Sequence, residues 1–173
     1  MNKVKEVLRS DEKPKEKVAL LTKTIKKGQK LFVELMEVLE TGTDVEKGTC
    51  ADAMKHITED KPEIAKPYID EIIKHISSDV KRVKWGVPES IGNIARKFPK
   101  EAAKAVPKLL LNTKDKSTVI RWCAAYGLAE IAKHNSEEAK TLVPKIKKLA
   151  EAEDNNGVKN FYLKALKTLE KKE

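Results

Sequence analysis

Cysteines, aromatic residues and long apolar segments are scarce in this sequence. The two cysteines among its 173 residues, Cys50 and Cys123, stand far apart and form no CxxC or Cys/His ligand spacing, which argues against a disulfide framework and a zinc site. The most apolar stretch, LFVELMEVL, is short and is interrupted by Glu34 and Glu37, so it is unsuited to crossing a membrane. The N-terminal residues contain no apolar signal core. We therefore expect a cytoplasmic protein with no membrane partner.

Sequence motifs of catalytic and cofactor sites are absent as well. The chain contains no GxxxxGK[ST], GxGxxG, GxSxG or HExxH. Its three histidines, His56, His75 and His134, have no second ligand at a metal-binding spacing. The sequence therefore predicts no catalytic residue, no metal and no cofactor, and leaves enzymatic activity unassigned.

The composition itself favours helices. Aromatic residues make up 5% of the chain, whereas apolar residues make up 40% and charged residues 36%, a mixture rich in good helix formers. The formal net charge is +9, which favours anionic partners through nonspecific electrostatics but does not determine a fold.

An internal repeat decides the fold. The segment RVKWGVPESIGNIA (82–95) returns as VIRWCAAYGLAEIA (119–132) when Val83 is set against Ile120, which aligns Trp85 with Trp122. Weaker copies occur at 46–57 and 158–169. Apolar residues fall at positions 0, +4, +7, +8 and +11 of each copy, the spacing of one helix face. Small residues at +4 and +7, such as Ala124 and Gly127, are expected to let neighbouring helices approach closely.

These segments predict antiparallel helix pairs. The expected pairs are 29–41 with 45–58, 63–76 with 80–97, 100–112 with 117–134, and 137–151 with 156–171. Residues 1–28 are expected to form N-terminal capping helices, a degenerate repeat, and residues 29–173 a single repeat array. Pro67, Pro107 and Pro144 fall inside first helices, where each should kink the axis, and Pro88 should bend a second helix.

The pattern V-[RK]-x-x-A-x-x-[AG]-L-x-x-[IL], followed by a VP-containing helix such as EAAKAVPKLLL (101–111), resembles a HEAT repeat. The resemblance covers about residues 29 to 171. It implies an all-α, right-handed α-solenoid of about four to five HEAT-like antiparallel helix pairs, with first helices on the convex side and second helices on the concave side. A likeness to the HEAT-like phycobilin lyases depends on the repeat alone.

One basic residue stands at the same helical position of each repeat, after an acidic turn residue. The basic residues are Lys47, Lys84, Arg121 and Lys159, and the acidic residues are Asp44, Asp79, Asp115 and Asp154. HEAT proteins commonly show a ladder of this kind. We favour a structural ladder, in which the aspartates cap helices and pair with cations of a neighbouring repeat, over a ligand-binding stripe.

Trp85 and Trp122 lie off the apolar face and are expected near the concave surface. They either anchor a partner, as Trp and Arg do at binding hot spots, or pack between repeats as large spacers, each with its indole N–H reaching a carbonyl. The candidate partner-binding residues of this face are Trp85, Trp122, Arg121, Lys84, Glu89, Glu130, Arg96 and Lys133. Their charges are mixed in sign, whereas a nucleic-acid groove needs a connected cationic track. The dense lysine runs KTIKKGQK and KIKK are expected on terminal or convex helices as solvated surfaces.

Two functions fit this pattern. The first is a noncatalytic HEAT-repeat binding scaffold that presents its concave surface to a protein or peptide partner. The alternative is a nucleic-acid-binding HEAT-like protein related to DNA alkylation repair, because the HEAT-like alkylpurine DNA glycosylases place Trp, Arg and an acidic residue against DNA. Trp85, Trp122, Arg121 and either Glu89 or Glu130 resemble that set, but the family's catalytic acid has no matching residue. The oligomeric state is left open.

Overall fold

A computed structural model describes residues 2–172, so Met1 and Glu173, the outer ends of the two expected segments, lie outside it. The described chain is built from α-helices with short 3₁₀ segments between them. The α-helices are α1 (Lys3–Arg9), α2 (Pro14–Lys27), α3 (Phe32–Thr41), α4 (Asp44–Asp60), α5 (Ile69–Lys74), α6 (Lys81–Ala95), α7 (Pro99–Ala102), α8 (Val106–Asn112), α9 (Thr118–His134), α10 (Ser136–Ala152) and α11 (Asn156–Glu170). The 3₁₀ segments are η1 (Gln29–Leu31), η2 (Pro62–Tyr68), η3 (His75–Ser77) and η4 (Ala103–Ala105).

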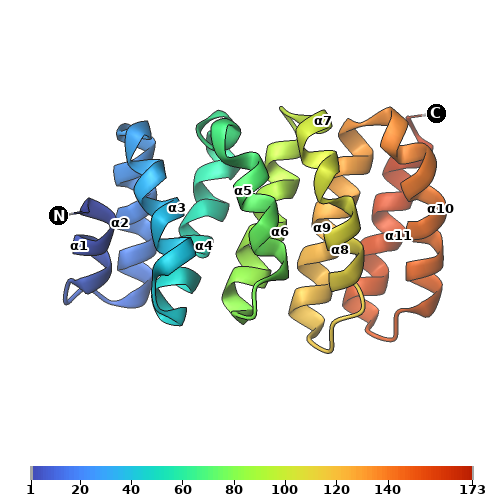
Figure 1. Ribbon diagram of the computed structural model, residues 1–173. Helices are drawn as coiled ribbons and strands as arrows, with labels where there is room; N and C mark the ends of the chain where they lie inside the picture. The colour runs from blue at the N-terminus through green and yellow to red at the C-terminus, as the bar shows by residue number, and fades with distance from the viewer. Residues whose placement is uncertain (1, 173) are drawn as a thin grey trace.

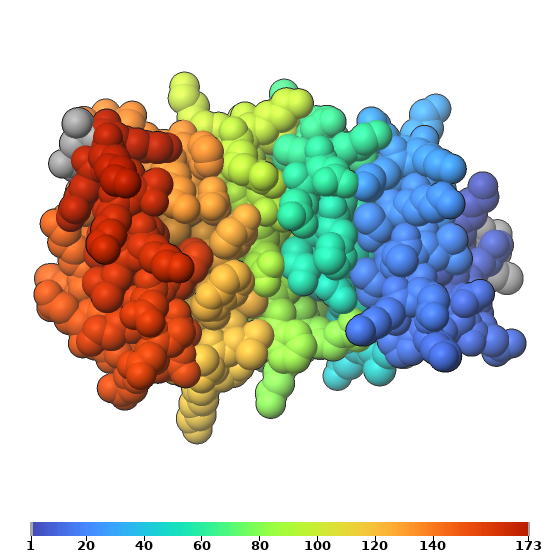
Figure 2. All heavy atoms as spheres, turned by 180° about the vertical axis from the view of Figure 1, so that it is seen from behind, coloured from blue at the N-terminus to red at the C-terminus, as the bar shows by residue number. Residues whose placement is uncertain are grey.

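The helices stack side by side in two layers, with the chain ends at opposite ends of the stack (Figure 1). One layer, here the first-helix layer, contains α3, α5, α8 and α10. The other, here the second-helix layer, contains α2, α4, α6, α9 and α11, and its outer surface is the second-helix face (Figure 2). Each first helix packs against its sequence partner, and the second helices pack in series along their layer, α2 on α4, α4 on α6, α6 on α9 and α9 on α11. The predicted all-α solenoid of helix pairs is confirmed.

Uncharged side chains, not aspartates, cap three of the second helices, α4, α9 and α11. The Thr43 hydroxyl accepts from the Glu46 N–H, and the Glu46 carboxylate accepts from the Thr43 N–H, which completes a capping box at α4. At α9 the Ser117 hydroxyl accepts from the Ile120 N–H, and at α11 the Asn155 side-chain oxygen accepts from the Val158 N–H. The expectation that aspartates cap the second helices is therefore wrong at these three positions, and it is also wrong at α6, which follows Asp79 and has no side-chain cap. Asp44 instead occupies the first turn of α4.

Prolines interrupt two of the first helices and leave the other proline-bearing helices continuous. Pro67 lies in η2, just before α5 begins, and Pro107 lies in the first turn of α8 after η4. A proline ring removes one hydrogen bond and clashes with the preceding turn, and 3₁₀ geometry accommodates both effects. Pro144 and Pro88 stay inside unbroken helices, α10 and α6.

Glycines bring the central second helices into close contact. A Cβ atom at Gly86 of α6 would lie 2.5 Å from the Ala51 carbonyl oxygen of α4. A Cβ atom at Gly127 of α9 would lie 3.0 Å from the Pro88 carbonyl oxygen of α6, which confirms the expected close approach there. Helix α2 contains no glycine. The second-helix layer is thus tight from α4 to α9.

Clefts open at both ends of that tight region. One lies between α2 and α4, and the other between α9 and α11. The core beneath is apolar and continuous, with Val83, Val87 and Ile91 of α6 and the matching Ile120 and Leu128 of α9 all buried. Within residues 2–172, no helix has the length and apolar character needed to cross a bilayer.

Candidate functional site

Trp85 and Trp122 occupy matching positions on α6 and α9, and both are half-buried. The cleft beside Trp122 is lined by residues of α6, α9 and α11, three helices of the second-helix layer, so Trp122 opens onto the second-helix face. Trp85 lines a smaller hollow with Asp52 and Lys55 of α4. The helical repeat therefore presents both indoles partly to solvent and partly to a neighbouring repeat.

Trp122 belongs to an aromatic cluster that joins α9 to α11. Its ring stacks on Tyr126 one turn later, with ring centres 5.9 Å apart and planes 12° apart. It also contacts Phe161 of α11, with centres 5.2 Å apart. Tyr126 and Phe161 are themselves half-buried. The spacing of four residues within one helix predicts that Trp122 and Tyr126 are neighbours. The contact with Phe161 could not be predicted in this way, because it depends on how α11 is aligned with α9.

Tyr126 continues this cluster into a polar network that crosses three helices. Its hydroxyl donates to the Asn93 side-chain oxygen at 2.7 Å, and the Asn93 amide donates to the Lys55 carbonyl and to the Thr58 hydroxyl. A Cβ at Gly92 would lie 2.6 Å from the Tyr126 ring, so the ring covers bare backbone of α6. Burial raises the pKa of Tyr126 to about 12, and Glu130 adds to the effect. The network fixes one edge of the aromatic cluster.

The indole nitrogen of Trp85 distinguishes this residue from Trp122. The indole nitrogen of Trp85 is buried and has no hydrogen-bond partner among the described residues. The packing interpretation of the sequence expected that nitrogen to reach a carbonyl, and it does not. Trp85 thus packs its polar edge inward and offers its apolar surface beside Arg82 and Gly86.

The cleft between α9 and α11 encloses about 330 Å³. Its walls come from Trp122, Val119 and Val158, with Glu89 of α6 at one side. The Glu89 carboxylate accepts from the Cys123 thiol at 3.4 Å. Burial, reinforced by that carboxylate, raises the pKa of the Cys123 thiol, and burial raises the pKa of Cys50 to about 12. Both thiols are therefore protonated at neutral pH, so neither is an activated nucleophile.

The fold matches solved helical-repeat structures, whereas no known protein family and no curated protein matches the sequence. A crystal structure of an engineered protein superposes with a TM-score of 0.75 at 18% identity, over 98% of this chain and 81% of that one. A second engineered protein gives 0.71 at 18% identity, over 98% and 80% of the two chains. A designed armadillo repeat protein in complex with the peptide (KR)4 gives 0.63 at 18% identity, over 98% and 90%. The chain is a helical-repeat solenoid.

Two cations of the basic stripe reach carboxylates of the following repeat. The Lys84 ammonium nitrogen lies 3.4 Å from a carboxylate oxygen of Asp115. Arg121 pairs with Glu153, not with the neighbouring Asp154, through two hydrogen bonds of 3.1 and 3.0 Å. Arg121 also donates to the carbonyls of residues 115 and 116. These contacts engage the Arg121 guanidinium inside the solenoid, so it does not project toward a ligand.

The remaining stripe residues form no ion pair within the described part of the chain. They are Lys47, Lys159, Asp44, Asp79 and Asp154. The three aspartates are exposed and the two lysines are half-buried. Among the described residues the ladder therefore has two rungs, Lys84–Asp115 and Arg121–Glu153.

The other predicted surface residues divide between local pairs and backbone contacts. Glu130 pairs with Lys133 at 3.5 Å and with His134 at 3.3 Å on the same helix. Arg96 is exposed and donates to the Glu59 carbonyl of the preceding repeat at 3.0 Å. The structure brings Trp122 and Glu89 to one cleft, but it does not gather the charged residues of the predicted set around it.

The Arg121–Glu153 pair predicts a specific pH dependence. Burial alone would raise the pKa of Glu153, but hydrogen bonds from Arg121 and the Asn155 N–H lower it below its ordinary value of 4.5. A lowered folded-state pKa stabilises the fold above that ordinary value, and the stabilisation is lost as the pH falls through the folded-state pKa. We expect Glu153→Gln to lower the free energy of unfolding by about 1–2 kcal/mol at pH 7 and by less at pH 3. Urea unfolding of both proteins at pH 7, 5 and 3 measures this, and a difference that is constant with pH would contradict it.

Proposed function

We propose that this solenoid is a noncatalytic scaffold that binds a segment of a protein partner on its second-helix face. The observation that carries the proposal is the half-exposed cluster of Trp122, Tyr126 and Phe161 beside the α9–α11 cleft. Large aromatic side chains that are already held in place bind with little loss of conformational entropy, and Trp and Tyr are enriched at binding hot spots. The cluster is therefore the anchor, and Trp85 extends the apolar surface one repeat toward the N-terminus.

The fold supports this function independently of the cluster. Stacked repeats give an extended surface suited to long segments, and a designed armadillo protein of similar fold is known in complex with a peptide. The contacts of Arg121 weaken the nucleic-acid alternative, because its guanidinium is committed to Glu153 and to two carbonyls. We further propose that the repeats are HEAT-like, as the sequence pattern indicates, and that residues 2–28 cap the N-terminal end of the array.

Replacing Trp122 with leucine tests the anchor. Peptides selected from a displayed random library on the wild-type chain should bind the Trp122→Leu variant at least tenfold more weakly, because the side chain loses most of its ring contact area but stays apolar. Fluorescence anisotropy of labelled peptides gives the dissociation constants. Leucine is chosen over alanine because Trp122 also packs against the core, and a thermal melt of the variant verifies folding.

Leu111 provides the matched control, since it is an apolar side chain of α8 in the first-helix layer and is 69% exposed. Leu111→Ala should leave peptide affinity within twofold of wild type. The anchor is wrong if the selected peptides bind Trp122→Leu as tightly as wild type. If no peptide binds but double-stranded DNA changes the tryptophan emission saturably, the nucleic-acid alternative replaces the proposal.

A further inference from the structure

The cleft between α2 and α4 lies on the second-helix face, at the opposite end of the tight region from the Trp122 cluster. It encloses about 870 Å³. Its side chains include six lysines, three carboxylates and one histidine, and they are Lys15, Lys23, Lys26, Lys27, Lys55, Lys61, Asp52, Glu59, Asp60 and His56. Val18, Ala19 and Thr22 of α2 complete it. The expectation that the lysine run belongs to a solvated terminal surface overlooked this cleft.

Helix α2 and the residues beside it are strongly basic, whereas the segment that follows is acidic. Residues 13–30 contain seven lysines and one glutamate, whereas residues 31–60 contain eight acidic residues and two lysines. Despite that difference in charge, a single ion pair joins α2 to α4 in the described chain, between Lys26 and Asp60. The other lysines of α2 therefore do not serve to neutralise acidic residues of α4.

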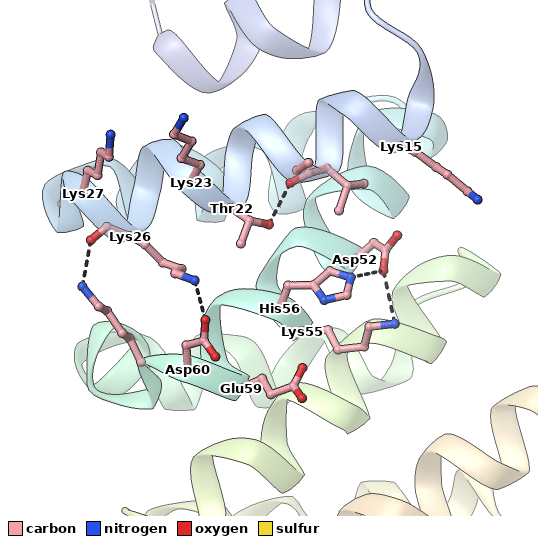
Figure 3. A pocket seen from close by; sticks show the side chains of 13 residues that line it. Lys15, Thr22, Lys23, Lys26, Lys27, Asp52, Lys55, His56, Glu59 and Asp60 are labelled. Carbon is pink, nitrogen blue, oxygen red and sulfur yellow. Dashed lines mark hydrogen bonds and ion pairs between the residues drawn. The ribbon is translucent and has the colours of Figure 1, made fainter.

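Three lysines of α2 have no acidic partner among the described residues and follow one ridge of the helix. Lys15, Lys23 and Lys27 are exposed and separated by multiples of four residues. Lys23 and Lys27 extend from the side of α2 away from α4, whereas Lys26 crosses toward Asp60 (Figure 3). Exposed lysine side chains rotate freely, so these ammonium groups can fold onto whatever lies in the cleft.

The surface between the walls is largely apolar. Val18 is buried below, and Ala19 stands between the lysines on the same ridge. The Thr22 hydroxyl donates to the Val18 carbonyl at 2.7 Å, so its hydrogen is used within α2. A ligand therefore meets an apolar base with cations along one rim.

The opposite wall, formed by α4, carries carboxylates. Asp52 lies 3.3 Å from Lys55 and 3.7 Å from His56, and Glu59 and Asp60 are exposed. Asp52 and Asp60 are already paired with cations, whereas Glu59 forms no ion pair among the described residues. Glu59 repels a phosphate backbone, which offers only acceptors. A polypeptide backbone offers N–H donors, which carboxylates accept. The two walls together suit a peptide whose side chains are acidic.

We infer that the α2–α4 cleft binds an acidic segment of the protein partner. The inference depends on the proposed function, because it names the charge of the segment that the scaffold binds. Lys23 and Lys27 are about 6 Å apart along the helix axis, close to the roughly 7 Å between side chains on one side of an extended peptide. Acidic residues at alternate positions of the partner segment therefore match this rim. The designed armadillo protein, in contrast, is known with the basic peptide (KR)4.

A labelled peptide tests the charge of the ligand directly. The probe is a fluorescein-labelled twelve-residue peptide in which Glu alternates with Ala and Leu, and its control has Gln in place of Glu. Fluorescence anisotropy with the full chain at low salt should show saturable binding of the Glu peptide, at least tenfold tighter than the Gln peptide. Its affinity should fall as salt is added. The triple variant Lys15→Gln, Lys23→Gln, Lys27→Gln should bind the Glu peptide about tenfold more weakly.

The matched control removes the same charge elsewhere. Lys145, Lys147 and Lys148 are exposed on α10 of the first-helix layer, and their triple glutamine variant should bind within twofold of wild type. Equal weakening by both triple variants would show nonspecific attraction and overturn the inference. So would the absence of binding, or single-stranded DNA of equal charge binding as tightly with the same lysine dependence. If the chain self-associates and the α2 variant is monomeric in light scattering, a second copy fills the cleft and the inference is wrong.

The two proposals fail separately. Peptides that depend on Trp122 but not on the α2 lysines would leave the scaffold function standing and overturn the acidic segment. Binding of the Glu peptide that depends on the lysines but not on Trp122 would support the α2–α4 cleft as the binding site of an acidic segment and remove the aromatic anchor.

Discussion

Gly86→Ala is expected to lower the free energy of unfolding by about 2–3 kcal/mol and the melting temperature by roughly 5–10 °C. The added Cβ would lie 2.5 Å from the Ala51 carbonyl oxygen and 2.7 Å from its carbon. These are backbone atoms of α4, so they cannot move aside as a flexible side chain would, and the two helices must separate. Alanine is the better helix former by about 1 kcal/mol, and the expected loss remains after that gain.

Gly28→Ala is the control for this prediction. Gly28 follows α2, and its Cβ would meet Leu31 Cδ1 at 3.4 Å, which is ordinary contact. Its unfolding free energy should stay within about 0.5 kcal/mol of wild type. Thermal and urea unfolding followed by circular dichroism measures both variants. If the two variants were equally stable, the close approach of α4 and α6 would not require glycine at residue 86.

Arg121→Ala is expected to cost about 3 kcal/mol of unfolding free energy. The change removes two hydrogen bonds to Glu153 and two to main-chain carbonyls. It also leaves the Glu153 side chain, which is 7% exposed, without its cation. A charge that is buried and unpaired is more costly than the loss of an exposed pair, because water cannot replace the missing partner.

Lys84→Ala offers a comparison at the same position of the preceding repeat. Lys84 makes a single contact of 3.4 Å to Asp115, and both side chains are more than a fifth exposed, so the expected loss is below about 1 kcal/mol. Urea unfolding at pH 7 gives both values. The interpretation of Arg121–Glu153 as the stronger rung is wrong if the two substitutions cost the same.

The helix pairs could be predicted from the sequence because apolar spacing reports directly on which face of a helix is buried. The segment predicted at 117–134 is α9, Thr118–His134, and the segment predicted at 156–171 is α11, Asn156–Glu170. The caps were assigned to the wrong residues. An aspartate and a neighbouring Thr, Ser or Asn are equally able to cap, and only backbone geometry decides which one precedes the first turn.

The candidate site was less accessible to sequence reasoning. Position in the repeat placed Trp122 at the surface, but its neighbour Phe161 and the partner of Arg121 depend on how adjacent repeats align. Glu153 and Asp154 are consecutive, and one residue of helix register decides between them. The α2–α4 cleft could not be predicted because α2 does not match the repeat pattern, so nothing in the sequence aligned its lysines with α4.

The glycine contacts of the central helices also determine where the solenoid opens first. In repeat arrays each unit is stabilised chiefly by its immediate neighbours, and local unfolding begins where those contacts are weakest. Helices α4, α6 and α9 share close backbone approaches, so we expect their amide hydrogens to be the slowest to exchange with solvent. The two clefts lie against the faster-exchanging terminal helices, and a ligand in either cleft slows exchange at its own end of the array.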